Sequence, residues 1–251
     1  MMLHLVPRHP RPVAGVRDGR GAADAGVLPP VAPLPVLPPG AVRRLRTTAR
    51  VLDVALAGLA LVVLAPVMAV VAVVVACTSR GPALFRQVRV GQYGRLFVLY
   101  KFRTMYADCD DRLHREYVHK LLTDPAGAAC GTESLYKLVD DPRITPVGRW
   151  LRQSSLDELP QLVNVLRGEM ALVGPRPVLP WEAALFDPRH SKRFLLPPGI
   201  TGLWQASGRN QLTMTQALDL DVEYVERQCL RLDLAILLRT IPVVLGRKAV
   251  R

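Results

Sequence analysis

The longest apolar stretch of the chain runs from Val54 to Cys77 and contains no charged residue. As one straight helix it would be about 36 Å long, enough to cross a hydrocarbon core of about 30 Å. A core helix of a soluble domain rarely stays apolar on every face for so long. Pro66, near the middle, removes a helical hydrogen bond. The pattern predicts a membrane-embedded helix and leaves two forms open: a kinked spanning helix, or one that breaks at Pro66 and returns to the face it entered.

After this segment, apolar and polar positions alternate as in a soluble mixed domain. Residues 84–90 and 96–100 flank a turn at residues 91–94, a pattern that predicts a β-hairpin. Helical spacing marks residues 159–166, 216–227 and 230–245. The last of these is amphipathic and is expected to pack in the core or to lie on a membrane surface. Residues 107–140 are polar and show no clear pattern.

Positive charge and proline are concentrated near the N-terminus. The formal net charge is +12, and residues 1–50 contribute +6 of it together with nine of the 22 prolines. Such proline content disfavours helix, so residues 1–42 are predicted to be a disordered tail without a secretory signal. Arginines flank both ends of the apolar stretch, so the positive-inside rule favours neither orientation. The excess charge fits nucleic acid, anionic lipid or a phosphorylated substrate.

Asp157 and Glu158 form an adjacent pair of carboxylates that follows Arg149 and Arg152. Ser155 precedes Glu158 by three residues, the spacing of a capping box, so a helix start with acidic residues in its first turn is one interpretation. The other is functional, because an aspartate can attack phosphorus or hold Mg²⁺ that bridges phosphate oxygens. Both interpretations stay open from these residues alone.

Three other segments carry cations suited to phosphate. Arg176 lies between two prolines, which fix the backbone and suit bidentate phosphate recognition. Lys101 and Arg103 fall on one side of an extended chain after the predicted hairpin. The glycine-punctuated segment 198–209 ends at Arg209 and is either a nucleotide cradle or a long turn. Two D-x-D matches, at residues 108–110 and 219–221, are weak evidence for a metal site.

Six motifs occur in the order found in one protein family. They are Gly81-Pro82 with Gln87-Val88-Arg89-Val90-Gly91, Lys101-Phe102-Arg103-Thr104-Met105, Asp141-Pro142-Arg143-Ile144-Thr145, Leu156-Asp157-Glu158-Leu159-Pro160-Gln161, Gly174-Pro175-Arg176-Pro177 and Pro198-Gly199-Ile200-Thr201-Gly202. With them, the chain from about Arg50 to Leu245 resembles the monotopic bacterial sugar transferases. These are polyprenyl-phosphate sugar-1-phosphate transferases that begin exopolysaccharide, O-antigen and glycoconjugate assembly.

The resemblance implies an α+β protein with a re-entrant helix broken at Pro66, on the cytoplasmic face of the bacterial plasma membrane. The rest would be a small helix-rich catalytic domain with a β-hairpin and interfacial amphipathic helices. The expected division is a tail at 1–42, an arginine cluster and membrane helix at 43–80, a catalytic domain at 81–246 and a basic tail at 247–251. The N-terminal arginines suit anionic membrane lipid. A homodimer stays open.

The resemblance also implies a ping-pong reaction. Asp157 would attack the sugar-linked phosphorus of a UDP-sugar and release UMP, and polyprenyl phosphate would then accept the sugar phosphate. Glu158 would act with Asp157 in holding Mg²⁺, or would handle protons. The cations expected to bind substrate phosphates are Lys101, Arg103, Arg143, Arg152, Arg176 and Arg209.

Two functions from other classes compete with this one. A catalytically inactive membrane scaffold for polysaccharide assembly would keep the membrane helix but release no UMP. A basic nucleic-acid-binding protein would explain the charge, but it would leave residues 54–77 unused. Nucleic acid is therefore not an expected partner.

Overall fold

The computed structural model describes residues 39–107, 109, 112–123, 141–207 and 212–244. In chain order, its elements are α1 (Pro39–Thr78), β1 (Leu84–Val90), η1 (Gln92–Gly94), β2 (Leu96–Phe102), α2 (Arg112–Thr123), α4 (Pro146–Gln153), η2 (Leu156–Glu158), α5 (Gln161–Arg167), β3 (Ala171–Val173), α6 (Pro180–Ala183), η3 (Pro188–Leu195), β4 (Gly199–Thr201), α7 (Leu203–Ala206), α8 (Met214–Arg227) and α9 (Leu230–Val244). Residues 1–38 of the expected tail, the expected basic tail at 247–251, Arg209 and both aspartates of the first D-x-D match lie outside the described residues. The mixture of helices with small sheets agrees with the expected α+β class.

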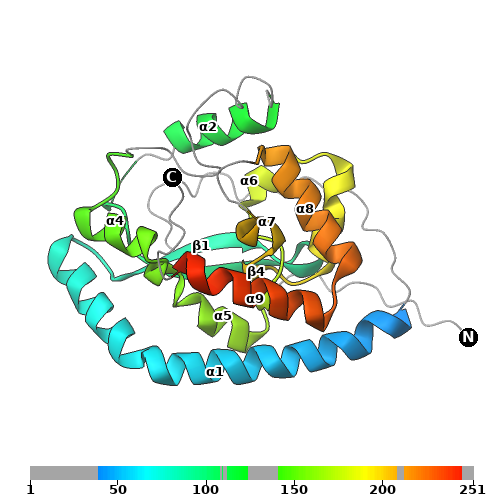
Figure 1. Cartoon of the computed structure of the whole chain (residues 1–251). Coiled ribbons are helices and arrows are strands. Elements are labelled where there is room, and N and C mark those ends of the chain that lie inside the picture. Colours follow the sequence, from blue (N-terminus) through cyan, green and yellow to red (C-terminus); the bar gives the residue numbers. More distant parts are fainter. Residues whose placement is uncertain (1–38, 108, 110–111, 124–140, 208–211, 245–251) are drawn as a thin grey trace, which may run out of the picture.

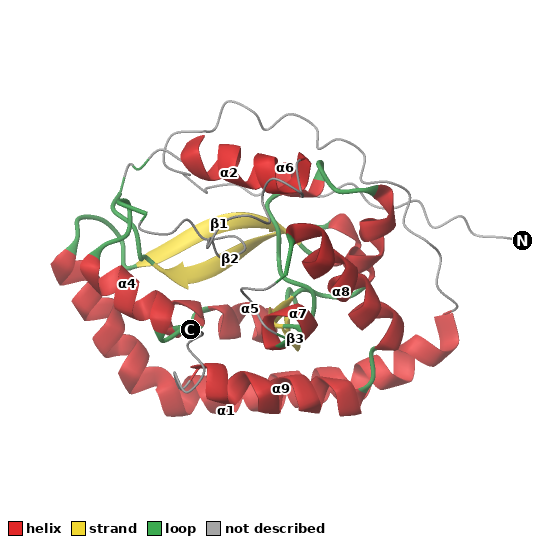
Figure 2. Cartoon of the chain, turned by 45° about the horizontal axis from the view of Figure 1, so that its top comes forward, coloured by secondary structure: helices red, strands yellow, loops and turns green. Residues whose placement is uncertain are grey.

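The predicted hairpin is confirmed by the antiparallel pairing of β1 with β2. Their register runs from Leu84 opposite Phe102 to Val90 opposite Leu96. The turn between them contains Tyr93 and Gly94, both in the left-handed region, with φ of 56° and 73°. The hairpin lies in the middle of the molecule, with α2 on one side and α1 on the other (Figures 1 and 2). It provides the surface against which the long apolar helix α1 and the site are both built.

Helix α1 is continuous over 40 residues and includes Pro66. The expected break at this proline does not interrupt the helix. A proline removes one hydrogen bond and bends a helix, and neighbouring turns can keep the helical path on both sides. Figure 1 shows α1 curving beneath the rest of the molecule, with both ends rising toward it. Thr48–Thr78 is the stretch of the described helices that is long and apolar enough to cross a membrane.

The two arms of α1, before and after Pro66, pack against the same domain. On the N-terminal arm, Ala57 is fully buried in a cluster with residues of β2 and α5. On the C-terminal arm, Val71 and Val75 are buried with Phe102 and Leu151, from β2 and α4. Burying a side chain of this size contributes about 1.5–3 kcal/mol. The contact is therefore a substantial interface along the length of α1.

The opposite face of α1 is apolar and exposed. Its large exposed side chains are Val51, Val54, Leu56, Leu59, Val62, Val63, Val67, Val70, Val73 and Val74. Val62, the most open of them, is 76% exposed. A contiguous apolar surface of this kind marks an interaction with a membrane or a partner.

A second small sheet pairs β3 with β4 in parallel, with Ala171 opposite Gly199 and Val173 opposite Thr201. Helices α8 and α9 cover it through buried Tyr224 and Ile236. Both helices fall where helical spacing was read from the sequence. Helix α2, by contrast, lies in the polar stretch that showed no clear pattern.

Candidate active site

The acidic pair lies in η2, a single 3₁₀ turn between α4 and α5. Ser155, just before it, has a φ of 57° and makes no side-chain capping bond. The capping box suggested by the sequence is therefore not formed, because a left-handed residue directs its side chain away from the next turn. Left-handed non-glycine residues are uncommon and often occur at functional sites. The strained turn sets the direction in which Asp157 and Glu158 leave the backbone.

Glu158 is paired with Lys101 from the neighbouring strand β2. The Nζ atom of Lys101 lies 3.0 Å from Oε1 of Glu158, and the two side chains are 20% and 25% exposed. This contact joins two residues 57 positions apart in the chain. Lys101 therefore lies at the acidic pair, and its role as a substrate ligand stays a prediction.

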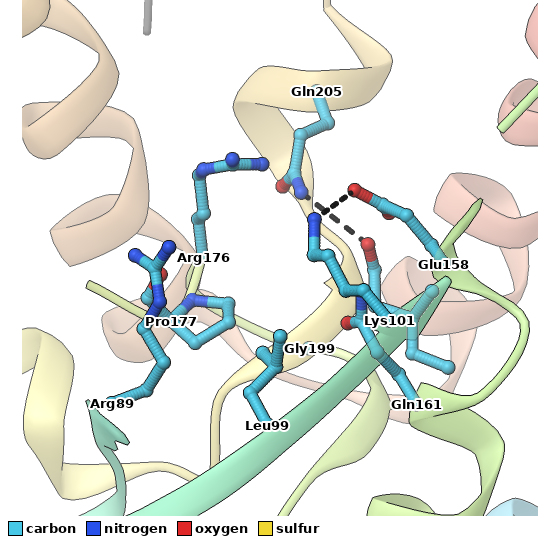
Figure 3. Close-up of a pocket in the computed structure, with 10 residues that line it drawn as sticks. Arg89, Leu99, Lys101, Glu158, Gln161, Arg176, Pro177, Gly199 and Gln205 are labelled. Atoms are coloured by element: carbon cyan, nitrogen blue, oxygen red, sulfur yellow. Dashed lines mark hydrogen bonds and ion pairs between the residues drawn. The ribbon is translucent and has the colours of Figure 1, made fainter. Parts of the chain in front are cut away.

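Lys101, Glu158 and Arg176 line one pocket. The other lining residues are Arg89, Leu99, Gln161, Pro177, Gly199, Ile200 and Gln205. Figure 3 shows Arg176 and Lys101 reaching from opposite sides toward the same space, with Gln205 above them. Three cations, one carboxylate and two carboxamides give the pocket groups that bind phosphate oxygens and hydroxyls.

Asp157 is 7% exposed and lies beside Arg152. Burial lowers the pKa of the Arg152 guanidinium, and the carboxylates of Asp157 and Asp141 oppose that shift. Arg152 also donates from Nε to Oγ1 of Thr104 at 2.8 Å, which ties it to the end of the hairpin. The positive charge expected beside the acidic pair is therefore supplied by Arg152. Arg176 is also near enough to influence the pKa of Arg152. Because Arg176 lines the pocket, Arg152 and Asp157 lie next to it.

Arg143 is engaged by Asp141, two residues earlier. Its Nε and Nη2 atoms donate to the two carboxylate oxygens at 2.8 and 2.7 Å. The Arg143 guanidinium holds the pKa of the Asp141 carboxyl below its usual value. The pair closes the turn before α4, where Thr145 caps the helix. Arg143 does not line the pocket, and its role as a substrate ligand stays a prediction.

Arg103 is directed away from the pocket, toward the end of α1. Its Nη2 donates to the carbonyl of Val75, in the last turn of α1, at 3.4 Å and to that of Ser79, just after the helix, at 2.7 Å; its Nη1 donates to the carbonyl of Pro82. The last carbonyls of a helix have no partner within the helix, and a cation there is stabilising. Lys101 and Arg103 thus face different elements: Lys101 contacts η2, whereas Arg103 holds the C-terminal end of the apolar helix.

The loop that carries Arg176 is fixed through four consecutive carbonyl groups. Residues 175–178 accept hydrogen bonds from Gly199 N at 2.9 Å, Arg193 Nη2 at 2.8 Å, Arg89 Nη1 at 3.3 Å and Val90 N at 2.9 Å, in chain order. The donors lie in three separate elements, β1, η3 and β4. With prolines on both sides of Arg176, this loop has little freedom to move. The rigidity predicted from the two prolines is therefore reinforced by long-range contacts.

Gln161 and Gln205 line the pocket, although the sequence did not mark either of them as a candidate substrate ligand. Gln161 closes the motif that contains the acidic pair, and Gln205 lies within the glycine-punctuated segment 198–209. A Cβ atom on Gly202 would lie 2.5 Å from Oε1 of Gln205, so this glycine leaves room for the carboxamide. The three-residue spacing of Gly202 and Gln205 was visible in the sequence, but their contact depends on how the loop folds.

The residues present fit a Mg²⁺ ion that binds together with phosphates. Among the described residues, no three side chains of His, Cys, Asp or Glu gather into a cage. Mg²⁺ is commonly held by one or two carboxylates together with substrate phosphates. Asp157 and Glu158 can provide the carboxylates. The second D-x-D match is engaged elsewhere: Asp221 pairs with Arg193, and Asp219 pairs with His190.

The fold and the site belong to a known class of proteins. The model of the bacterial sugar transferase family matches residues 44–247, and the chain belongs to this family. It is 43% identical over 166 residues to the galactosyl transferase CpsE of Streptococcus agalactiae, covering 66% of this chain and 35% of the relative. It is 44% identical over 167 residues to undecaprenyl-phosphate galactose phosphotransferase of Salmonella typhimurium, covering 66% and 34%.

A shorter relative is covered over most of its length. The exopolysaccharide production protein ExoY of Sinorhizobium fredii is 42% identical over 195 residues, which cover 78% of this chain and 84% of that protein. The chain spans about a third of the length of the first two relatives. The family resemblance read from the six motifs is thus confirmed.

Proposed function

We propose that the protein transfers a sugar-1-phosphate from a UDP-sugar to polyprenyl phosphate, giving polyprenyl-diphosphate sugar and UMP. The observation that carries the proposal is the gathering of Lys101, Arg152 and Arg176 around the Asp157–Glu158 pair. Phosphoryl transfer depends chiefly on positioning and on stabilising charge at the phosphate oxygens. Relatives named as undecaprenyl-phosphate galactose and glucose phosphotransferases support the same reaction class.

The reaction proceeds in two displacements at one phosphorus atom. A carboxylate oxygen of Asp157 attacks the sugar-linked phosphorus, the bond to the bridging oxygen breaks, and UMP leaves with that oxygen. A phosphate oxygen of the polyprenyl phosphate then attacks the same phosphorus, and the Asp157 carboxylate is released. Arg152 keeps a positive charge beside the nucleophile. Lys101 and Arg176, which reach into the pocket from opposite sides (Figure 3), would bind the phosphate oxygens.

Mg²⁺ held by Asp157 and Glu158 would neutralise charge on the diphosphate. Lys101 contacts the same Glu158 carboxylate and so keeps a protein-supplied positive charge at the acidic pair.

We further propose that α1 is re-entrant at the cytoplasmic face of the plasma membrane. Both arms of α1 pack against the same domain, through Ala57 before Pro66 and through Val71 and Val75 after it. A spanning helix would carry one arm to the far leaflet, away from that domain. In both views α9 runs across the molecule in roughly the same direction as α1, which lies below it (Figures 1 and 2). Its Leu234, Leu238 and Ile241 are 47%, 67% and 52% exposed, as expected of an interfacial helix.

A UMP-release assay tests the reaction. The protein in membranes, with Mg²⁺ and polyprenyl phosphate, is offered a panel of UDP-sugars, and UMP is measured. We expect release with at least one donor and its loss in Asp157→Asn, while Glu223→Gln, an exposed surface change, keeps full activity. With donor but no acceptor, mass spectrometry should find a sugar phosphate on the peptide that contains Asp157. Absence of UMP with every donor would favour an inactive scaffold.

Reporter fusions test the topology separately. Reporters placed before Arg43 and after Arg95 should both report the cytoplasm. Opposite sides would overturn the re-entrant arrangement and leave the chemistry untouched.

A further inference from the structure

A buried ion pair lies behind the loop that carries Arg176. Nη2 of Arg193, in η3, lies 2.5 Å from Oδ2 of Asp221, in α8, and the two side chains are 1% and 2% exposed. The guanidinium also packs near the rings of Phe186 and Phe194. Neither charge lines the pocket. The pair reaches the site through the main chain of Arg176, and the charge of the Arg176 guanidinium also helps to stabilise the Asp221 carboxylate.

Both members of the pair act on the main chain of Arg176. Nη2 of Arg193 donates to the carbonyl oxygen of Arg176 at 2.8 Å. The main-chain N–H of Arg176 helps to stabilise the carboxylate of Asp221. The peptide group after the Arg176 Cα atom therefore interacts with the positive charge of Arg193, and the one before it interacts with the negative charge of Asp221. These two peptide groups set the direction of the Arg176 side chain.

The pair is poorly explained as a source of stability. Two charges taken out of water commonly cost as much as their attraction returns, and an apolar replacement is often neutral. Two nitrogens of Arg193, Nε and Nη1, have no hydrogen-bond partner among the residues that the structure describes. The hydrogen bonds that Arg193 does make go to Asp221 and to the Arg176 loop.

We propose that Arg193 and Asp221 are positioning residues, which hold the Arg176 main chain so that its guanidinium faces the phosphates in the pocket. This inference rests on the proposed function of Arg176 as a phosphate ligand. Displacement of a binding group by about 1 Å can cost about a hundredfold in rate. Loss of the pair should therefore impair the reaction even though neither residue touches substrate.

The test is a double-mutant cycle on UMP release by the membrane-bound protein. Arg193→Met with Asp221→Leu removes both charges together and leaves neither unpaired. We expect activity to fall by about 10²-fold, with the thermal midpoint of the purified protein nearly unchanged. In an Arg176→Ala background, the same double change should cost less than about twofold, because a device that acts through Arg176 has nothing left to position.

The chain offers a matched control on the same two elements. Lys192, next to Arg193, pairs with Glu226 of α8 at 2.6 Å, but these side chains are 45% and 52% exposed. Lys192→Met with Glu226→Leu should leave UMP release unchanged in both backgrounds. If the apolar pair fails to fold, the exchange Arg193→Asp with Asp221→Arg keeps an ion pair but reverses the charges facing the Arg176 peptide groups. That variant should also lose activity.

The outcomes separate the two proposals. Full activity in the Arg193/Asp221 variant would overturn the positioning role, as would an equal loss with and without the Arg176 side chain. An Arg176→Ala variant with normal activity would instead overturn the role of Arg176 in the proposed function.

Discussion

Lys101 and Glu158 lie 3.0 Å apart, and their contact connects the end of strand β2 to the 3₁₀ turn that also carries Asp157. The contact does two things at once. It directs one carboxylate of the acidic pair into the pocket, and it keeps a positive charge beside two neighbouring negative groups. Because both side chains are partly exposed, the pair can rearrange when a phosphate or a metal ion enters.

Lys101→Met should reduce UMP release strongly while leaving the fold intact. Removing one group that stabilises developing charge costs about 10²–10³ in rate, whereas a partly exposed ion pair contributes at most about 1 kcal/mol to stability. The measurements are kcat/KM for the UDP-sugar and the thermal midpoint. Lys192→Met, in a surface pair of similar geometry, is the control and should change neither. If the thermal midpoint fell so far that unfolding accounted for the lost activity, the assignment of Lys101 to the substrate phosphates would be contradicted.

Arg103→Met should have the opposite signature, although Arg103 lies only two residues away. Its guanidinium donates to a carbonyl in the last turn of α1 and to two carbonyls just after it, and hydrogen bonds to a charged group contribute about 1.5–3 kcal/mol each. We expect a lower thermal midpoint, with KM for the UDP-sugar unchanged in the protein that remains folded. A raised KM at an unchanged midpoint would instead place Arg103 at the substrate, as its motif suggests.

These two neighbours show what the sequence can and cannot predict. Alternation and turn residues predicted the hairpin, because both are local properties of the chain. The motif order identified Lys101 and the acidic pair. What each side chain contacts depends on elements far away in the sequence: η2 for Lys101, and the end of α1 for Arg103. Short spacing alone therefore could not separate the pocket cation from the structural one.

The same limit explains what was missed elsewhere. The D-x-D match at residues 219–221 reads as a metal site or as chance. In the structure Asp221 instead forms an ion pair with Arg193, which joins α8 to η3. That contact follows from tertiary packing. The proline in α1 was expected to break the helix, but a local rule cannot weigh the contacts that hold both arms against the domain.

Substitutions at Ser155 should report the strain in the turn before the acidic pair. Its φ of 57° costs an L-residue about 1–2 kcal/mol, a cost that glycine does not have. Ser155→Gly should therefore keep or raise the thermal midpoint and retain UMP release. Ser155→Val should lower both, because a β-branched residue is a severe outlier there. Equal midpoints for the two variants would show that the left-handed turn is not required.

Gly148→Ala should be among the most destabilising small changes in the chain. A Cβ atom at this position would lie 2.0 Å from the carbonyl oxygen of Thr104, so α4 must move away from the hairpin end. That movement would also stretch the bond from Arg152 to Thr104, which places a positive charge beside Asp157. We expect loss of stability together with loss of UMP release. The measurements are the thermal midpoint and the specific activity of the folded fraction.

Gly58→Ala in α1 provides the matched control for that prediction. A Cβ atom there meets nothing within 4 Å, and alanine is favoured over glycine inside a helix by about 1 kcal/mol. The variant should be as stable as the parent or more so, with unchanged activity. If both alanine variants behaved alike, the close approach of α4 to Thr104 would have no energetic consequence, and the packing that holds Arg152 at the acidic pair would have to be reassigned.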